Sequence, residues 1–350
     1  MPIVGWIIHL KGVWKMKRST SILSIAAIIV IAMSSLGAIL YYQGSNSGSN
    51  SSPSPSPPIS SSLPLSLTDD AGYTLTLTKY PDRIVSLAPA NTQILFAVGA
   101  GDKVVGVTKY DNYPYNFSAW IEAGNMSSIG SYYNPSVEPI VALNPDLVVA
   151  ALGSSDCAIQ LRSLGYNVLT LNPPDIYGVL KNIQIIGNAT NHAGDAQTLV
   201  SSLQQRIDVV INGIKDATTR PKVYNEIYSD PYTSVGGGTF IDGLIKLAGG
   251  QNIFENATEA YPKVSSEAVI EENPDVIVFP SNMGATAFWG SFADVSNRPG
   301  WSSINAIKNQ KLYVVSADAI NQPGPRQVDA LEALATIIHP EIFGEYTNPT

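Results

Sequence analysis

The sequence predicts an α/β protein with two parallel-sheet α/β lobes, which are joined by a single long helix and separated by a cleft. Three observations support this fold class. A unit of similar sequence occurs twice, at 136–149 and at 265–278. Strand-like and helix-like segments alternate along both halves of the chain. A long apolar stripe of helical periodicity lies between the halves. The duplication is typical of a protein built from two similar units.

Each copy of the repeated unit carries a glutamate near its start and Asn-Pro-Asp near its end. The first copy reads Ser-Val-Glu-Pro-Ile-Val-Ala-Leu-Asn-Pro-Asp-Leu-Val-Val, and the second reads Ser-Ser-Glu-Ala-Val-Ile-Glu-Glu-Asn-Pro-Asp-Val-Ile-Val. Proline cannot continue a helix and disfavours helical geometry at the residue before it. The unit therefore predicts a short helix, a stop and a buried parallel strand.

The glutamates of the unit, Glu138 and Glu267, have two explanations. A first-turn carboxylate behind a serine N-cap interacts with the positive end of the helix dipole, which contributes about 0.3–1 kcal/mol. This explains a lone glutamate, although the acid follows the serine by two residues rather than the three of a capping box. Recurrence at the matching place in both lobes predicts instead a pair of exposed carboxylates on one rim of the molecule.

The first lobe, 64–190, is predicted to begin with a hairpin over 65–78 that turns at Asp69-Asp70-Ala71-Gly72. Asn91 is the expected N-cap of a helix at 92–98. The helix ends at Gly99-Ala100-Gly101, which is the wrong context for a dinucleotide-binding loop. The other expected elements are strands at 83–88, 104–107, 146–151 and 167–171 and a helix near 157–164.

The segment between the lobes, 191–217, is expected to be one helix of about seven turns, with Asn191 as its N-cap. Its stripe is Ala196, Leu199, Val200, Leu203, Ile207, Val210, Ile211 and Ile214. One stiff connecting helix restricts hinge motion, so we expect only modest closure on a ligand.

The second lobe, 218–350, repeats the alternation. Strands are expected at 222–228, 275–279 and 311–316, and helices at 240–248 and 328–338. Gly236-Gly237-Gly238 offers backbone N–H groups to an anion, but it lacks the Lys-Ser/Thr ending of a phosphate loop. An anion site there is the less favoured interpretation.

The composition excludes several classes of protein. With 350 residues, 45% of them apolar and 14% charged, the chain can form two domains of ordinary size. A net charge of -8 and an isoelectric point of about 4.9 argue against nucleic acid as a partner. Cys157 is the only cysteine, and His9, His192 and His339 are far apart in sequence. We therefore expect no metal site, no cofactor and no histidine-based catalytic triad.

The amino-terminal region, 1–42, predicts the compartment. Lysines and an arginine precede an uncharged apolar tract at 22–42 that is long enough to cross a bilayer as a helix. Positive charge before the tract places everything after it outside the cell. Small residues at Ser35 and Gly37 leave a cleaved signal peptide as the alternative. Because no cysteine follows the tract, a lipid-modified anchor is not expected. Met16 is an alternative start.

The segment 43–63 is nearly all Ser, Pro, Gly and Asn, which predicts a solvated tether between the membrane and the lobes.

Potential glycan acceptors on the outer side are Asn50, Asn116, Asn125, Asn188 and Asn256. Such triplets arise often by chance.

From about residue 67 to 346 the chain resembles the cobalamin and iron-siderophore group of substrate-binding proteins for ABC importers. The resemblance rests on the two glutamate units and on motifs at 83–92, 104–107, 112–114, 164–168 and 248–254. It implies two α/β lobes joined by one rigid helix, and an ABC permease and ATPase as partners. It also implies that Glu138 and Glu267 dock onto arginines of the permease.

The ligand is expected between the lobes, where loops follow the carboxyl ends of the strands. These loops carry aromatic residues, each with a flat apolar wall and a polar tip: Tyr113, Tyr132, Tyr133, Tyr232 and Tyr261. Any single tyrosine can equally be surface or core filler. The resemblance assigns Tyr113, Tyr132, Tyr232 and Tyr261 to the cleft aromatics of vitamin B12 binders. Arg326 is a candidate for a propionate, amide or phosphate group, or an ordinary helix-start residue.

Three functions are therefore considered. The favoured one is an extracellular corrinoid-binding protein that supplies an ABC importer. A ferric siderophore or haem in the same cleft is the alternative, and the few basic residues of the cleft loops speak against an anionic siderophore. The third is a secreted α/β enzyme, which would require a nucleophile beside a base or clustered metal ligands. The sequence offers neither.

Overall fold

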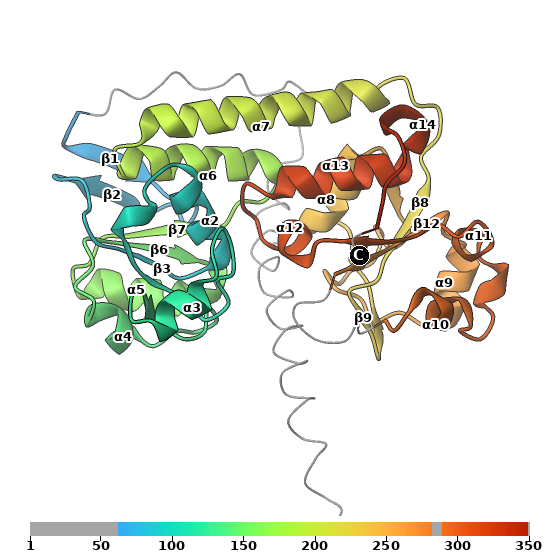
Figure 1. Ribbon diagram of the computed structural model, residues 1–350, viewed down its shortest axis with the longest axis horizontal. Coiled ribbons are helices and arrows are strands. Elements are labelled where there is room, and N and C mark those ends of the chain that lie inside the picture. Colours follow the sequence, from blue (N-terminus) through green and yellow to red (C-terminus); the bar gives the residue numbers. More distant parts are fainter. Residues whose placement is uncertain (1–61, 282–288, 349–350) are drawn as a thin grey trace, which may run out of the picture.

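The computed structural model describes residues 62–281 and 289–348. The predicted membrane tract, most of the tether and Asn50 lie outside these ranges. None of the helices within them combines the length and the apolar character that a bilayer crossing requires. Figure 1 shows the two α/β lobes side by side, with helix α7 running across both of them. The predicted fold class is confirmed.

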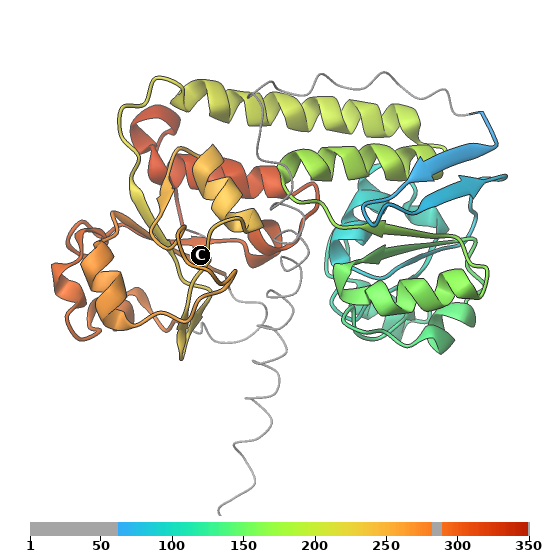
Figure 2. The ribbon, with the colours of Figure 1, turned by 180° about the vertical axis from the view of Figure 1, so that it is seen from behind.

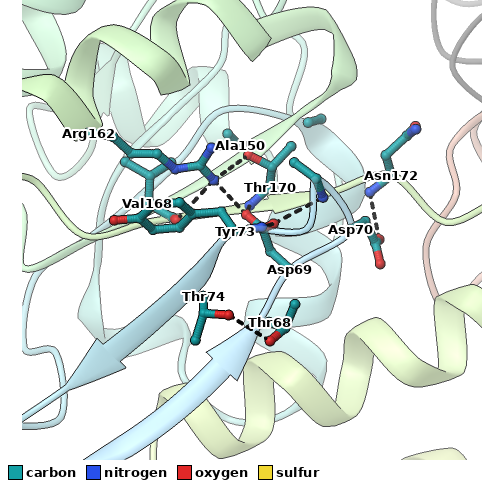
Figure 3. A network of polar contacts seen from close by, with 12 residues as sticks. Thr68, Asp69, Asp70, Tyr73, Thr74, Ala150, Arg162, Val168, Thr170 and Asn172 are labelled. Carbon is teal, nitrogen blue, oxygen red and sulfur yellow. Dashed lines mark hydrogen bonds and ion pairs between the residues drawn. The ribbon is translucent and has the colours of Figure 1, made fainter.

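The first lobe begins with the predicted hairpin, in which β1 (Leu65–Thr68) pairs antiparallel with β2 (Thr74–Leu77). The Asp69 carboxylate closes the turn by accepting the N–H groups of Ala71 at 3.0 Å and Tyr73 at 2.9 Å. Its other oxygen accepts from Arg162 at 2.5 Å, and the Arg162 guanidinium lies 4.3 Å from the centre of the Tyr73 ring. Figure 3 shows how this network ties the hairpin to the sheet.

The sheet of the first lobe is parallel and has the strand order β5-β4-β3-β6-β7. Its strands are β3 (Ile84–Ser86), β4 (Val104–Val107), β5 (Ser127–Ser128), β6 (Leu147–Ala151) and β7 (Val168–Leu171). Its helices are α2 (Pro89–Ala97), α3 (Phe117–Glu122), α4 (Val137–Val141), α5 (Ser155–Ser163) and α6 (Ile176–Ala189), with short 3-10 turns at Gly101–Lys103 and Leu152–Ser154. Neighbouring strand residues alternate between two apolar cores, one on each face of the sheet.

The second lobe has a parallel sheet of order β11-β8-β12-β13 and a short antiparallel hairpin of β9 and β10. The strands are β8 (Lys222–Asn225), β9 (Tyr228–Ser229), β10 (Tyr232–Thr233), β11 (Gln251–Asn252), β12 (Val276–Pro280) and β13 (Leu312–Val315). The helices are α8 (Phe240–Leu247), α9 (Ser266–Glu272), α10 (Phe292–Ser296), α11 (Asn305–Lys308), α12 (Ala317–Asn321), α13 (Gln327–Ile338) and α14 (Pro340–Phe343), with a 3-10 turn at Trp301–Ser303.

The two lobes repeat one topology. In the first lobe, β3 lies between β4, which follows α2, and β6, the strand of the repeated unit. In the second lobe, β8 lies in the same way between β11, which follows α8, and β12, the strand of the second repeated unit. The helix of the repeated unit is α4 in the first lobe and α9 in the second. In both copies the asparagine before proline adopts a left-handed backbone, with φ of 46° at Asn144 and 48° at Asn273. The predicted order of helix, stop and buried strand is therefore confirmed in both copies.

The connecting helix α7 spans Ala193–Ile214, or 22 residues, which is about six turns rather than seven. Its N-cap is His192, and the expected cap, Asn191, instead takes a left-handed φ of 67° in the tight turn before it. The turn folds the chain back from α6, a helix that the sequence analysis missed. Figure 2 shows α6 and α7 side by side above the first lobe.

The expected helix start at Asn91 is also wrong. Helix α2 begins three residues earlier than predicted, with Pro89 in its first turn and Ala88 as N-cap, because proline is well suited to a first helical position. Asn91 is buried, and its amide donates to the carbonyls of Val149 and Ala150 at 3.1 and 3.0 Å. The side chain therefore ties the helix to β6.

Among the described sequons, Asn116, Asn125 and Asn256 are exposed and accessible. Asn188 is only 5% exposed within α6. A glycan at Asn188 is incompatible with this fold, because it would have to pass through the packing of that helix.

The α6 and α7 backbones approach closely at Gly187. A Cβ atom there would lie 2.2 Å from Cβ of Ala196 and 2.9 Å from the carbonyl oxygen of His192. We expect Gly187→Ala to lower the free energy of unfolding by about 1–3 kcal/mol, as overpacking does. Urea unfolding measures this change. The control is Gly243→Ala in α8, where no atom lies within 4 Å of the added methyl group; equal effects of both variants would contradict the prediction.

Candidate functional site

Loops at the carboxyl ends of the strands bring the lobes into contact. The Gln93 amide on α2 donates to the side-chain oxygen of Gln322 at 2.5 Å, and the Asn112 amide donates to the Asp318 carboxylate at 2.9 Å. Gln322 in turn donates to the other Asp318 oxygen at 3.0 Å. Helix α2 and the loop at Asn112 in the first lobe are therefore tied to α12 and its C-cap residue in the second.

Two predicted ligand residues meet at this contact. The guanidinium carbon of Arg326 lies 4.5 Å from the centre of the Tyr113 ring, and Tyr113 is 44% exposed. Arg326 also donates to the Ser316 hydroxyl at 3.2 Å and lies 4.0 Å from the Asp318 carboxylate. The arginine is held by its neighbours but keeps part of its surface accessible, so it can meet a polar or anionic group between the lobes.

A second group of tyrosines gathers from both lobes. Burial, together with the smaller effect of the nearby phenols of Tyr261, Tyr133 and Tyr110, raises the pKa of Tyr132 to about 12. Tyr132 is 8% exposed, and its ring packs so close to Gly153 that a Cβ there would lie 2.6 Å from it. Tyr132 belongs to the first lobe and Tyr261 to the second, so this group of tyrosines draws residues from both lobes.

Tyr232 packs on the core of the second lobe. Its ring centre is 5.7 Å from that of Trp301, and the Arg298 guanidinium lies 4.8 Å from the Tyr232 ring. Arg298 makes a two-point ion pair with Glu226, at 2.6 and 2.8 Å, and both side chains are nearly inaccessible. The sequence analysis missed this pair, although Glu226 directly follows a strand end.

The glycine triplet does not hold an anion in this fold. The N–H of Gly236 donates to the carbonyl of Ala260 at 2.8 Å, and that of Gly238 donates to the Asp242 carboxylate at 3.0 Å. A carboxylate at the loop repels an anion. Among the described residues, no group of three or more His, Cys, Asp or Glu side chains is placed to hold a metal ion.

The predicted docking glutamates, Glu138 on α4 and Glu267 on α9, are both exposed. Ser265 caps α9 by accepting the N–H of Ala268 at 3.1 Å, whereas Ser136 makes no side-chain cap to α4. Figures 1 and 2 show α4 and α9 on the side of the molecule away from α7, one on each lobe. A partner that contacts both helices would therefore approach from that side.

Asp111, next to the interlobe residue Asn112, is a buried carboxylic acid. Its carboxylate accepts from the backbone and hydroxyl of Thr108 at 2.9 and 2.5 Å, and burial raises its pKa to about 6. The unfolded-state value is about 3.9. Between these values the folded state binds more protons than the unfolded state, so the free energy of unfolding falls as pH rises from about 4 to 6.

Asp111→Asn removes this titration while keeping an oxygen acceptor for Thr108. We expect the stability of the variant relative to the natural protein to rise by about 2–3 kcal/mol between pH 4 and 7. Urea unfolding at a series of pH values measures the difference. Parallel pH profiles for the two proteins would contradict it.

Comparison with known proteins identifies the family. A family model described as periplasmic binding protein matches residues 84–319. The chain is 34% identical to an ABC transporter substrate-binding lipoprotein, YvrC, of Bacillus subtilis, over 81% of this chain and 88% of that protein. It is 30% identical to a cobalamin-binding protein of Halobacterium salinarum, over 79% of this chain and 75% of that one.

Solved structures agree with this assignment. The vitamin B12 binding protein BtuF of Vibrio cholerae superposes with a TM-score of 0.62 at 25% identity, over 74% of this chain and 96% of BtuF. The heme-binding protein RhuT of Roseiflexus gives the same TM-score and identity, over 74% of this chain and 98% of RhuT. The predicted resemblance is confirmed, and the chain belongs to the periplasmic binding protein family, whose members are substrate-binding components of ABC importers.

Proposed function

We propose that the protein captures cobalamin or another corrinoid between its lobes, outside the cell, and delivers it to an ABC permease. The observation that carries this proposal is the gathering of tyrosines from both lobes around Tyr132, and the contact between Tyr113 and Arg326 across the lobes supports it. Each aromatic side chain can bury about 150–250 Å². Walls of this kind fit a large, flat and partly apolar ligand.

The relatives support a corrinoid over other flat ligands. Cobalamin-binding and vitamin B12-binding proteins match most of this chain. In the proposed complex, the tyrosines contact the faces and edges of the corrin ring. Arg326 binds an amide or phosphate oxygen at its periphery, as guanidinium groups do.

Haem or a ferric siderophore is the second candidate, and the similarity to heme-binding RhuT favours it. Tyrosine binds iron as the phenolate. Burial instead raises the pKa of Tyr132 to about 12, which disfavours the phenolate before a metal arrives. Tyr132 is therefore better suited to an apolar wall than to an iron ligand, which places the corrinoid first.

Delivery requires a contact that forms and releases. In the proposed complex, Glu138 and Glu267 pair with basic groups of the permease, one from each lobe. Exposed ion pairs contribute about 0–1 kcal/mol each. Two of them set orientation and register without making release slow. The Bacillus relative, a lipoprotein by name, supports a place on the outer face of the membrane.

Titration of the purified full chain tests the ligand. We expect cyanocobalamin to quench tryptophan fluorescence and to bind at least tenfold more tightly than hemin or a ferric siderophore. Tighter binding of hemin would favour the second candidate and reject the corrinoid.

Aromatic truncation tests the proposed wall. Tyr132→Ala and Tyr261→Ala are each expected to weaken cyanocobalamin binding about tenfold or more, because buried aromatic anchors dominate such sites. Calorimetry measures the affinity. The control is Tyr73→Ala in the first-lobe hairpin, an exposed tyrosine that stacks on Arg162; its affinity should match the unchanged protein.

Charge reversal tests docking. The double variant Glu138→Lys, Glu267→Lys is expected to abolish uptake of labelled cyanocobalamin by cells in which it is the only copy. Its affinity in solution should change less than twofold, because both side chains are exposed and belong to α4 and α9 rather than to the loops that carry the tyrosines. A large loss of affinity would assign the glutamates to the ligand site or to the fold.

A further inference from the structure

The two helices that carry the exposed glutamates are too short to be stable by themselves. Helix α4 has five residues and α9 has seven, whereas isolated helices in water need about 12–15 residues even for marginal stability. Their position therefore depends on contacts with the rest of the lobe.

A basic residue at the start of the central strand holds the end of each helix. In the first lobe, Arg83 donates through Nε and Nη2 to the carbonyl of Leu143, just beyond α4, at 2.9 and 2.8 Å. In the second lobe, Lys222 donates to the carbonyl of Glu272, the last residue of α9, at 3.0 Å. A cation suits this place, because helix carbonyls there lack intrahelical partners and carry partial negative charge.

The aspartate of each repeated unit binds the backbone of the same basic residue. Asp146 accepts the N–H of Arg83 at 3.1 Å, and Asp275 accepts that of Lys222 at 3.0 Å. The aspartate N–H groups donate back to the carbonyls of Arg83 and Lys222 at 2.8 and 2.9 Å. The left-handed asparagine, Asn144 or Asn273, lies in the chain between the bound carbonyl and the aspartate, so each set forms a closed ring of contacts. We call Arg83 with Asp146 the first helix anchor and Lys222 with Asp275 the second.

We infer that Arg83 and Lys222 are positioning residues for docking, which fix the glutamate helices against the sheets so that Glu138 and Glu267 meet the permease together. This inference rests on the proposed docking role of the glutamates. The two residues differ in size and shape but share a cationic donor aimed at a helix carbonyl. That shared chemistry, in the same place of both lobes, is what a matched pair of docking helices requires.

The variants Arg83→Met and Lys222→Met, singly and together, remove the donors and keep an unbranched side chain. We expect at least tenfold faster amide hydrogen exchange in residues 137–143 for the first variant and in 266–272 for the second. Exchange in α6 and α7 should not change. The double variant should lower uptake of labelled cyanocobalamin about tenfold or more, with affinity in solution within twofold of the unchanged protein.

Two further variants separate positioning from general stability. The swaps Arg83→Lys and Lys222→Arg retain a cationic donor and are expected to restore both slow exchange and uptake. Lys181→Met removes a surface lysine that pairs with Asp70 at 3.0 Å in the first lobe. This control variant should change neither amide exchange in the glutamate helices nor uptake. If the double variant does not fold, the single variants decide the question, because each anchor serves one helix.

The outcomes distinguish this inference from the proposed function. If charge reversal of the glutamates leaves uptake intact, the docking proposal fails, and the positioning role fails with it. If charge reversal abolishes uptake but the methionine variants retain normal uptake or normal exchange, the docking proposal stands and the helix anchors are only structural. The inference is supported if the methionine variants show both lower uptake and faster amide exchange in the glutamate helices, and if the Arg83→Lys and Lys222→Arg swaps restore both.

Discussion

The chain passes from the first lobe to the second through α7, and the packing of this helix determines where the lobes lie relative to each other. Its apolar face buries Ala196, Val200, Leu203, Ile207 and Val210, against α6 in the first lobe and α13 in the second (Figure 1). On its polar side, Arg206 pairs with Asp329 and Glu332 of α13 at 2.7 and 2.6 Å. The side-chain contacts around Asp318 form a second link below the helix. With two links of this kind, closure on a ligand is restricted and the lobes present a nearly fixed pair of surfaces.

This rigidity gives the duplication its use. The parallel sheets place loops at their carboxyl ends, and in both lobes these loops face the space below α7. The glutamate helices lie on the outer flanks of the same side of the molecule. Under the proposed function, ligand contact and partner contact use different residues on this common frame. A bound ligand would then affect the partner only through small shifts of the frame.

Two buried ion pairs among the described residues hold parts of the lobes together. Arg162 and Asp69 fasten the hairpin, and Arg298 and Glu226 lie beneath Tyr232 in the second lobe. Removing one member of such a pair leaves an uncompensated buried charge, which costs several kcal/mol. The Arg298 guanidinium also contacts the rings of both Tyr232 and Trp301. The rings of Tyr232 and Trp301 are thus supported by the Arg298–Glu226 ion pair, whereas Tyr132 is supported by close packing on Gly153.

The sequence by itself determined the two-lobed parallel architecture, because Asn-Pro-Asp and the alternation of strands and helices act through local backbone preferences. It also placed the glutamates on matching helices. It missed α6, although Ile176, Val179, Leu180 and Ile183 have helical spacing and Pro173-Pro174-Asp175 before them is a start signal. It misplaced the cap at Asn91 because tertiary packing uses that side chain elsewhere. It misplaced the cap at Asn191 because that residue takes a left-handed backbone in the turn before α7. Only the tertiary structure decided that Tyr113 meets Arg326, that Tyr232 packs on Trp301, and that Glu226 pairs with Arg298. These contacts join residues far apart in the chain, and no local pattern encodes them.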